Sequence, residues 1–143
     1  MQLHFSKYDF KIKQVENTYL IFDAFRKLWV VLTPEEWVRQ NMLVYLTNTM
    51  QYPAALIAVE KSILLGSLLK RCDIIVYKAD KPWMIVECKA QNIPLSTAVL
   101  DQILMYNQVL KVEYLIVSNG SYTNGWHIEN NVVAITEMPN YLV

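Results

Sequence analysis

Two acidic residues and a lysine lie on neighbouring apolar segments in the middle of the chain. Asp73 opens the run DIIVY, and Glu87 and Lys89 lie at the end of the run MIVECK. Ionised side chains are rare in segments of this composition unless they are paired, bind a metal or take part in catalysis. Carboxylate and main-chain carbonyl oxygens are the ligands that Mg²⁺ prefers. Asp73, Glu87 and the carbonyl of Cys88 are therefore candidate metal ligands.

This set of residue types suits the metal-dependent hydrolysis of a phosphodiester. A divalent cation polarises the phosphoryl group and offsets the charge that develops on it. Lys89 is two residues beyond Glu87 and therefore on the same face of a strand. Its amino group would orient or help to deprotonate the attacking water. The residues predict Mg²⁺ as the cofactor, with Mn²⁺ as a substitute.

The candidate ligands require a particular hairpin geometry. Residues 72–78 and 83–89 read as two strands of a hairpin that is connected by residues 79–82. A connection of two or four residues would place Asp73 opposite Cys88, with its side chain on the wrong face for Glu87. The sequence therefore predicts an odd-length connection or a β-bulge in this hairpin.

Further elements are expected on both sides of the hairpin. Thr33 and Pro34 predict the start of a helix that runs to about residue 50, with the Glu36 side chain reaching back to the cap's amide. Residues 54–65 predict a strand, and residues 95–110 predict a helix with one apolar face. Residues 113–120 predict a strand that is buried on both sides. A right-handed crossover would make this last strand parallel to residues 83–89.

The two ends of the chain predict additional strands. Residues 8–22 predict a hairpin that turns at residues 16–18, followed by a short helical turn over residues 24–29 that Asp23 caps. Two weaker strands are expected at residues 125–128 and 132–135. We expect one domain over residues 1–143, with an N-terminal extension (1–32), a core (33–120) and C-terminal strands (121–143).

Composition limits the class of protein. The chain has 143 residues, of which 54% are hydrophobic and only three are glycine, so we expect it to fold throughout. Without an apolar run long enough to span a bilayer or a signal-peptide pattern, a cytoplasmic protein is expected. The formal net charge is zero, so any nucleic-acid binding must depend on local charge.

The order of the expected elements resembles the restriction-endonuclease-like core, an α/β fold of a helix, a three-stranded antiparallel meander, a crossover helix and a parallel strand. Asp73 with Glu87-x-Lys89 resembles the PD-(D/E)xK nuclease motif, although Cys72 stands where that motif often has proline. Gln102 and Tyr106 resemble the QxxxY motif of RecB-type nucleases. That resemblance implies that they lie beside the metal site and contact it or the nucleic acid.

Four segments in order resemble the N-terminal nuclease domain of type I restriction enzyme R subunits: PEEWVRQ, KRCDIIVY, MIVECKA and YLIVSNG. The likeness covers roughly residues 28–125. It implies a DNA endonuclease of restriction-modification, and Glu36 would match a first-helix acidic residue that contacts the metal or its water. The chain has no GxxxxGK[ST] loop and is not expected to translocate DNA alone. A motor or specificity subunit would then be a partner, and a double-strand cut would favour a homodimer.

Several alternatives remain open at this point. Glu36 is also explained by helix capping alone, and Gln102 and Tyr106 by a position on the rim of an amphipathic helix. Glu60 is a further candidate ligand, although pairing with Lys61 or Lys70, or plain exposure, also explains it. The whole chain could be a catalytically silent nuclease-fold module that binds DNA or a protein partner. A DNA-repair or RNA-directed nuclease of the same fold is the remaining alternative.

Overall fold

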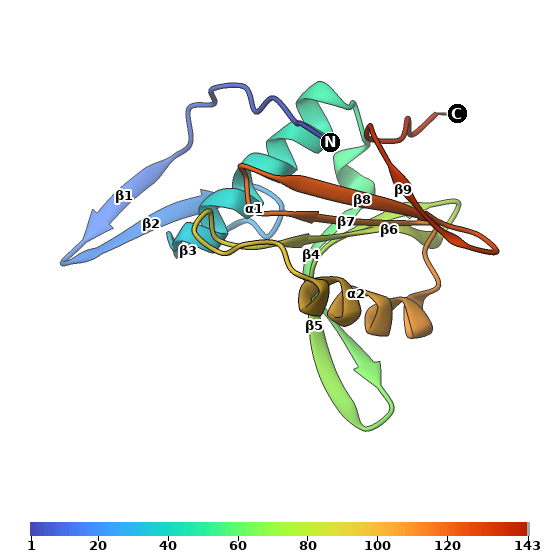
Figure 1. The fold of residues 1–143 in the computed structure, drawn as a ribbon. Helices are drawn as coiled ribbons and strands as arrows, with labels where there is room; N and C mark the ends of the chain where they lie inside the picture. The colour runs from blue at the N-terminus through green and yellow to red at the C-terminus, as the bar shows by residue number, and fades with distance from the viewer. Residues whose placement is uncertain (143) are drawn as a thin grey trace.

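The computed structural model describes residues 1–142, apart from the side chains of Leu65, Tyr106, Val109 and Leu110. Within this part of the chain, a three-stranded sheet at the N-terminal end precedes a six-stranded sheet. Figure 1 shows the helices α1 and α2 on opposite sides of the larger sheet, and the smaller sheet projecting from one end. The chain is therefore a mixed α/β protein in which strands predominate.

The N-terminal sheet consists of β1 (Ile12–Val15), β2 (Thr18–Asp23) and β3 (Leu28–Val31), all antiparallel. The expected hairpin is confirmed by β1 and β2. The expected helical turn over residues 24–29 is wrong, because residues 24–27 form a turn and β3 pairs with β2. Asp23 Oδ1 accepts the amides of Phe25 and Arg26 at 2.7 and 2.9 Å, which closes this turn. Pairing with β2 therefore outweighs the helical preference of the segment.

Helix α1 (Pro34–Val44) begins where the sequence predicts and continues as a wider π-helical turn, η1 (Tyr45–Thr49). Thr33 Oγ1 accepts the Glu36 amide at 3.0 Å, which confirms the cap. The Glu36 carboxylate does not complete the expected capping box. It instead accepts hydrogen bonds from Arg26, Arg39 and Gln40, because charge-assisted bonds to two guanidinium groups are stronger than one to a neutral amide.

The larger sheet holds strands β4 to β9 in sequence order. A short 3₁₀ turn, η2 (Ala54–Leu56), replaces the first residues of the strand expected at 54–65. The elements that follow are β4 (Ile57–Leu65), β5 (Leu68–Lys78), β6 (Lys81–Cys88), α2 (Thr97–Leu110), β7 (Tyr114–Ser118), β8 (Thr123–Ile128) and β9 (Val132–Ile135). β4, β5 and β6 form an antiparallel meander, and β7 is parallel to β6 as predicted.

The larger sheet is buried on both faces. Val38, Met42 and Leu46 of α1 and η1 pack in one core cluster that includes Val86 and Ile116 of the sheet. On the other face, Ile103 of α2 packs in a second cluster with Ile75, Ile85 and Leu115. The central strands β6 and β7 consequently lie between two apolar layers, where a charged side chain needs a partner.

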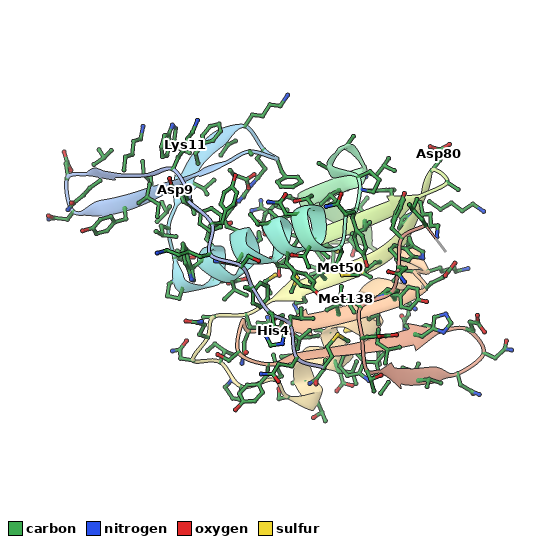
Figure 2. All side chains as sticks on the ribbon, turned by 90° about the horizontal axis from the view of Figure 1, so that it is seen from above. His4, Asp9, Lys11, Met50, Asp80 and Met138 are labelled. Carbon is green, nitrogen blue, oxygen red and sulfur yellow. The ribbon has the colours of Figure 1, made fainter. Side chains whose placement is uncertain are left out.

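The view from above in Figure 2 shows the smaller sheet and the β5–β6 turn on either side of α1. Lys11 marks the N-terminal sheet at one end, and Asp80 marks the β5–β6 turn at the other. Within residues 1–142, no helix is both long and apolar enough to cross a membrane.

Candidate functional site

The β5–β6 hairpin contains the register change that the sequence predicts. Ile74 pairs with Val86 and Val76 with Met84, whereas the next pair is Tyr77 with Pro82. Trp83 is therefore an extra residue in β6, and the turn itself spans only residues 79–80. Extending the ladder beyond Ile74 and Val86 places Asp73 opposite Glu87. The predicted bulge is confirmed.

A second irregularity lies across the sheet from Asp73. Glu60 in β4 has a φ of +55°, which is unusual for a residue other than glycine. Val59 pairs with Ile74 and Lys61 with Cys72, so Glu60 faces Asp73. Cys72 and Ile74 belong to different core clusters, although regular alternation would place them together. The irregular backbone around Glu60 thus changes which way the side chains of β5 point at Asp73.

Asp73 is only 5% exposed, and both of its carboxylate oxygens are hydrogen-bonded. Oδ1 accepts from Arg39 Nη2 at 2.6 Å, and Oδ2 accepts from the Cys88 amide at 2.8 Å. The carboxylate is therefore fixed between α1 on one side and the end of β6 on the other.

Glu87 is equally buried but is less completely satisfied. Its Oε1 lies 3.6 Å from Lys89 Nζ, while its Oε2 is buried and has no hydrogen-bond partner in the described part of the chain. Burial, and then the negative charge of Asp73, raises the pKa of Glu87 from its ordinary value of 4.5 to about 8. At neutral pH the isolated protein would therefore hold this carboxyl group largely protonated.

Arg39 is the main cation of the site, and the sequence reasoning missed it. Its Nη2 lies 2.6 Å from Asp73 and 2.9 Å from Glu60, and its Nη1 lies 2.7 Å from Glu36. Burial disfavours the charged guanidinium, but the carboxylates of Asp73, Glu36 and Glu60 together outweigh this effect and raise the pKa of Arg39. The signal available in PEEWVRQ was an arginine three residues after Glu36, on the same helical face.

The remaining predicted site residues are Glu36, Gln102 and Tyr106. Glu36 reaches Asp73 only through Arg39, because its carboxylate bonds to Arg26, Arg39 and Gln40. Gln102 is half-buried on α2, a helix that contacts β6. The side chain of Tyr106 lies outside the described residues.

Glu60 does not form the expected pairs with Lys61 or Lys70. Its carboxylate forms ion pairs with Arg39 at 2.9 Å and with Arg71 at 3.3 Å. Burial, with the nearby Asp73 carboxylate as a further cause, raises its pKa, although Arg39 acts in the opposite direction. Three acidic side chains, Glu60, Asp73 and Glu87, are thus neighbours in the site.

The donor set is compatible with a divalent metal ion, although it is not arranged as a finished site. Among the side chains that the structure describes, no group of three or more His, Cys, Asp or Glu residues is arranged to hold a metal. The unpartnered Glu87 Oε2 beside Asp73 is nevertheless an oxygen in need of a cation or a donor. Mg²⁺ needs only one or two protein carboxylates, with water and substrate completing its shell. The residues present therefore fit this ion, provided that Asp73 Oδ1 shares or gives up its bond to Arg39.

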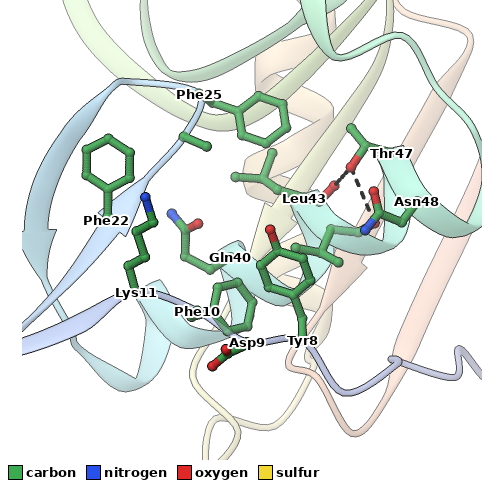
Figure 3. A pocket seen from close by; sticks show the side chains of 12 residues that line it. Tyr8, Asp9, Phe10, Lys11, Phe22, Phe25, Gln40, Leu43, Thr47 and Asn48 are labelled. Atoms are coloured by element: carbon green, nitrogen blue, oxygen red, sulfur yellow. Dashed lines mark hydrogen bonds between the residues drawn. The ribbon is translucent and has the colours of Figure 1, made fainter.

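A separate cavity of about 340 Å³ lies between the N-terminal sheet and α1. Figure 3 shows Tyr8, Phe10, Phe22 and Phe25 around it, with the Gln40 side chain between the sheet and the helix. Asp73, Glu87 and Lys89 do not line this cavity. Gln40 connects the cavity to the charged residues beside the site, because its amide donates to Asp23 and Glu36.

Together these elements define a mixed α/β protein with a buried acidic site. A bulged hairpin carries Asp73 and Glu87, and Lys89 lies beside Glu87. Residues 34–140 match the family described as type I restriction enzyme R protein N terminus. The chain belongs to that family, which confirms the resemblance noted in the sequence and connects the chain to restriction-modification systems. No curated protein matches the chain.

Proposed function

We propose that this chain is a magnesium-dependent DNA endonuclease domain of the restriction-modification type. Its family is named for a restriction enzyme subunit, which supports a nuclease-related role. The observation that carries the proposal is the closeness of Asp73 and Glu87 at the bulged hairpin, where Glu87 Oε2 is buried without a hydrogen-bond partner in the described part of the chain. Buried carboxylates with shifted pKa values are typical of sites that do chemistry.

Each predicted site residue has a separate role in the proposed hydrolysis. Asp73, Glu87 and the Cys88 carbonyl would hold Mg²⁺, or Mn²⁺ in its place. When bound, the ion supplies Lewis-acid activation of the phosphodiester. Lys89, whose side chain is 23% exposed, would orient or help to deprotonate the attacking water and stabilise negative charge nearby. Gln102 and Tyr106 would contact the nucleic acid beside the site.

The proposal extends to the fold and the partners. The helix, meander, crossover helix and parallel strand are compatible with a restriction-endonuclease-like core. DNA is the proposed substrate, and a motor or specificity subunit is the proposed partner. A homodimer would supply the second active site that a double-strand cut requires. Such a nuclease would act in the cytoplasm.

One observation favours a second function, a catalytically silent module that keeps the nuclease fold. Arg39 already neutralises Asp73 at 2.6 Å and Glu60 at 2.9 Å, as expected of a structural salt bridge. In that case the chain would bind DNA or a protein partner without cleaving it. Metal binding separates the two functions, because only the nuclease needs the ion.

The first experiment measures cleavage of plasmid DNA by the purified protein with Mg²⁺ or Mn²⁺. We expect Asp73→Asn and Lys89→Ala to lose at least about 100-fold in rate, because each removes a ligand or the acid–base group. Asp80→Asn and Lys81→Ala, at the far end of the same hairpin, are matched controls that should retain activity. Circular dichroism would verify that all four variants fold.

Calorimetric titration with Mn²⁺ completes this test. The absence of binding at millimolar concentration would contradict the nuclease proposal and favour the silent module. Cleavage of single strands, duplexes, branched DNA and RNA would then separate restriction from repair or RNA-directed activity.

A further inference from the structure

A chain of alternating charges runs from the N-terminal sheet to the candidate site. Asp23 of β2 pairs with Arg26 at 2.6 Å, and Arg26 pairs with Glu36 of α1 at 2.7 Å. Glu36 pairs with Arg39 at 2.7 Å, and Arg39 pairs with Asp73 of β5 at 2.6 Å. Each contact is short enough to be a charge-assisted hydrogen bond. The five residues therefore form one connected relay across three elements.

The relay is protected from water along most of its length. Asp23, Glu36, Arg39 and Asp73 are buried, and the Arg26 side chain is 20% exposed. Gln40 supports it from the side, because its amide donates to Asp23 at 3.0 Å and to Glu36 at 3.2 Å. Because these residues are shielded from water, removing one charge leaves the neighbouring charge without a partner. The five residues of the relay therefore depend on one another.

The guanidinium of Arg39 bonds to the nearby carboxylates, but its own hydrogen-bonding capacity is not fully used. Its two terminal nitrogens bond to Glu36, Asp73 and Glu60, whereas its buried Nε has no partner in the described residues. An unsatisfied buried donor is unfavourable and needs an explanation. The position of Arg39 is explained if it is set by the need to hold Asp73.

We propose that Arg39 is the positioning residue of the site, and that Glu36, Arg26 and Asp23 hold it in place. Arg39 fixes Oδ1 of Asp73 while the Cys88 amide fixes Oδ2, so the carboxylate keeps one orientation beside Glu87. Asp23 and Arg26 lie outside residues 34–140, the segment that matches the family. The N-terminal sheet is therefore a working part of the site and not an appendage.

The role in catalysis rests on the proposed nuclease function, but the positioning itself can be measured without it. The Cys88 amide reports on Asp73 directly, because it donates to Oδ2 at 2.8 Å. The next amide, that of Lys89, donates to the Ser118 carbonyl at 2.8 Å and serves as an internal reference. Hydrogen exchange measured by NMR follows both amides in the same sample.

The decisive variant is Glu36→Gln, which keeps the size of the side chain but removes the charge between the two arginines. We expect exchange of the Cys88 amide to accelerate about tenfold or more, since a hydrogen bond to a charged group is weakened. The Lys89 amide should keep its protection. Arg39→Lys should behave like Glu36→Gln, because a single nitrogen cannot bridge Glu36 and Asp73.

Glu35→Gln is the matched control on the same turn of α1. Glu35 lies 3.5 Å from Arg39, and its side chain is 46% exposed, so this variant should leave the Cys88 amide unchanged. An equal effect of Glu35→Gln would show that net charge alone matters and would overturn the relay. Unchanged Cys88 exchange in folded Glu36→Gln, or equal acceleration at Lys89, would overturn it as well. Arg26→Lys tests the same connection from the N-terminal sheet if Glu36→Gln does not fold.

Cleavage assays distinguish the two proposals. We expect plasmid cleavage by Glu36→Gln to fall about tenfold in turnover, with Glu35→Gln retaining the wild-type rate. If wild-type protein neither binds Mn²⁺ nor cleaves DNA, the nuclease proposal fails while the Cys88 amide still tests the relay. If the wild type cleaves and Glu36→Gln cleaves equally well, the relay has no part in the reaction.

Discussion

At the scale of single residues, the three acidic side chains of the site have cationic partners of unequal strength. Glu60, Asp73 and Glu87 are neighbours, whereas the nearby cations are Arg39, Arg71 and Lys89. Arg71 is largely exposed to solvent, and Lys89 lies 3.6 Å from Glu87, so both are weaker partners than Arg39. Burial, and then the negative charge of Asp73, therefore raises the pKa of Glu87 despite Lys89, and this shift gives the protein a measurable pH dependence.

We expect the stability of the metal-free protein to fall as the pH rises from about 5 to about 8. The pKa of Glu87 is about 8 in the folded protein and 4.5 when unperturbed, so the folded state holds a proton that the unfolded state releases in this range. The loss should be at most about 1.4 kcal/mol per pH unit. Urea unfolding in EDTA at several pH values measures it.

Glu87→Gln should remove the contribution of this residue and make the slope shallower, because glutamine does not ionise. It should also be more stable than the wild type at pH 8 and above, where the wild type must bury a charge. An identical pH profile in both proteins would show that Glu87 ionises normally in the folded state.

At the scale of elements, tight packing of β8 against β7 and β9 supports β7, the strand that pairs in parallel with β6. Gly125 in β8 pairs with Ile116 of β7 and Ile135 of β9. A Cβ at this position would lie 2.8 Å from Ile116 Cδ1 and 2.7 Å from Met1 Cε, closer than carbon atoms approach in real structures. A methyl group here would have to displace the ends of the Met1, Ile116 and Ile135 side chains, so the constraint on Gly125 is one of space and not of backbone conformation.

Gly125→Ala should therefore lower the free energy of unfolding by about 1–3 kcal/mol, the usual cost of overpacking a core. Asn124→Ala is the matched control, because Asn124 is the neighbouring residue of β8 and is exposed. We expect that variant to stay within about 0.5 kcal/mol of the wild type. Chemical denaturation of both variants measures the difference, and equal stabilities would mean that the core adapts to the added methyl group.

At the scale of the whole molecule, a net charge of zero limits how the protein could bind the DNA substrate that we propose. Basic nucleic-acid-binding proteins release many counterions and lose affinity steeply as salt rises. This chain has only local positive charge, such as Lys61, Lys70 and Arg71 on the projecting β4–β5 hairpin. Phosphate contacts should therefore be few.

We expect a plot of log affinity against log salt for duplex DNA, measured by fluorescence anisotropy with Ca²⁺ in place of Mg²⁺, to be shallow. Its slope should correspond to no more than about four phosphate contacts. A slope matching eight or more contacts would show that a larger basic surface engages DNA than the net charge implies.

The sequence by itself determined most of the elements and the parity of the central hairpin. Asp73 and Glu87 fell on apolar strands with Lys89 just after the second, and the period-two rule required a bulge between them, which Trp83 supplies. The capped start of α1 and the parallel pairing of β7 were likewise readable, because both depend on local pattern and chain connectivity.

Only the tertiary structure decided what surrounds the acidic residues. Arg39 is 34 positions from Asp73 along the chain, and no local pattern connects them. The same holds for Arg26 with Glu36, and for Glu60, whose left-handed backbone is stabilised by its surroundings and not by its own preference. Buried charges choose their partners by proximity in the folded protein, so a single sequence shows where charges are but not which of them meet.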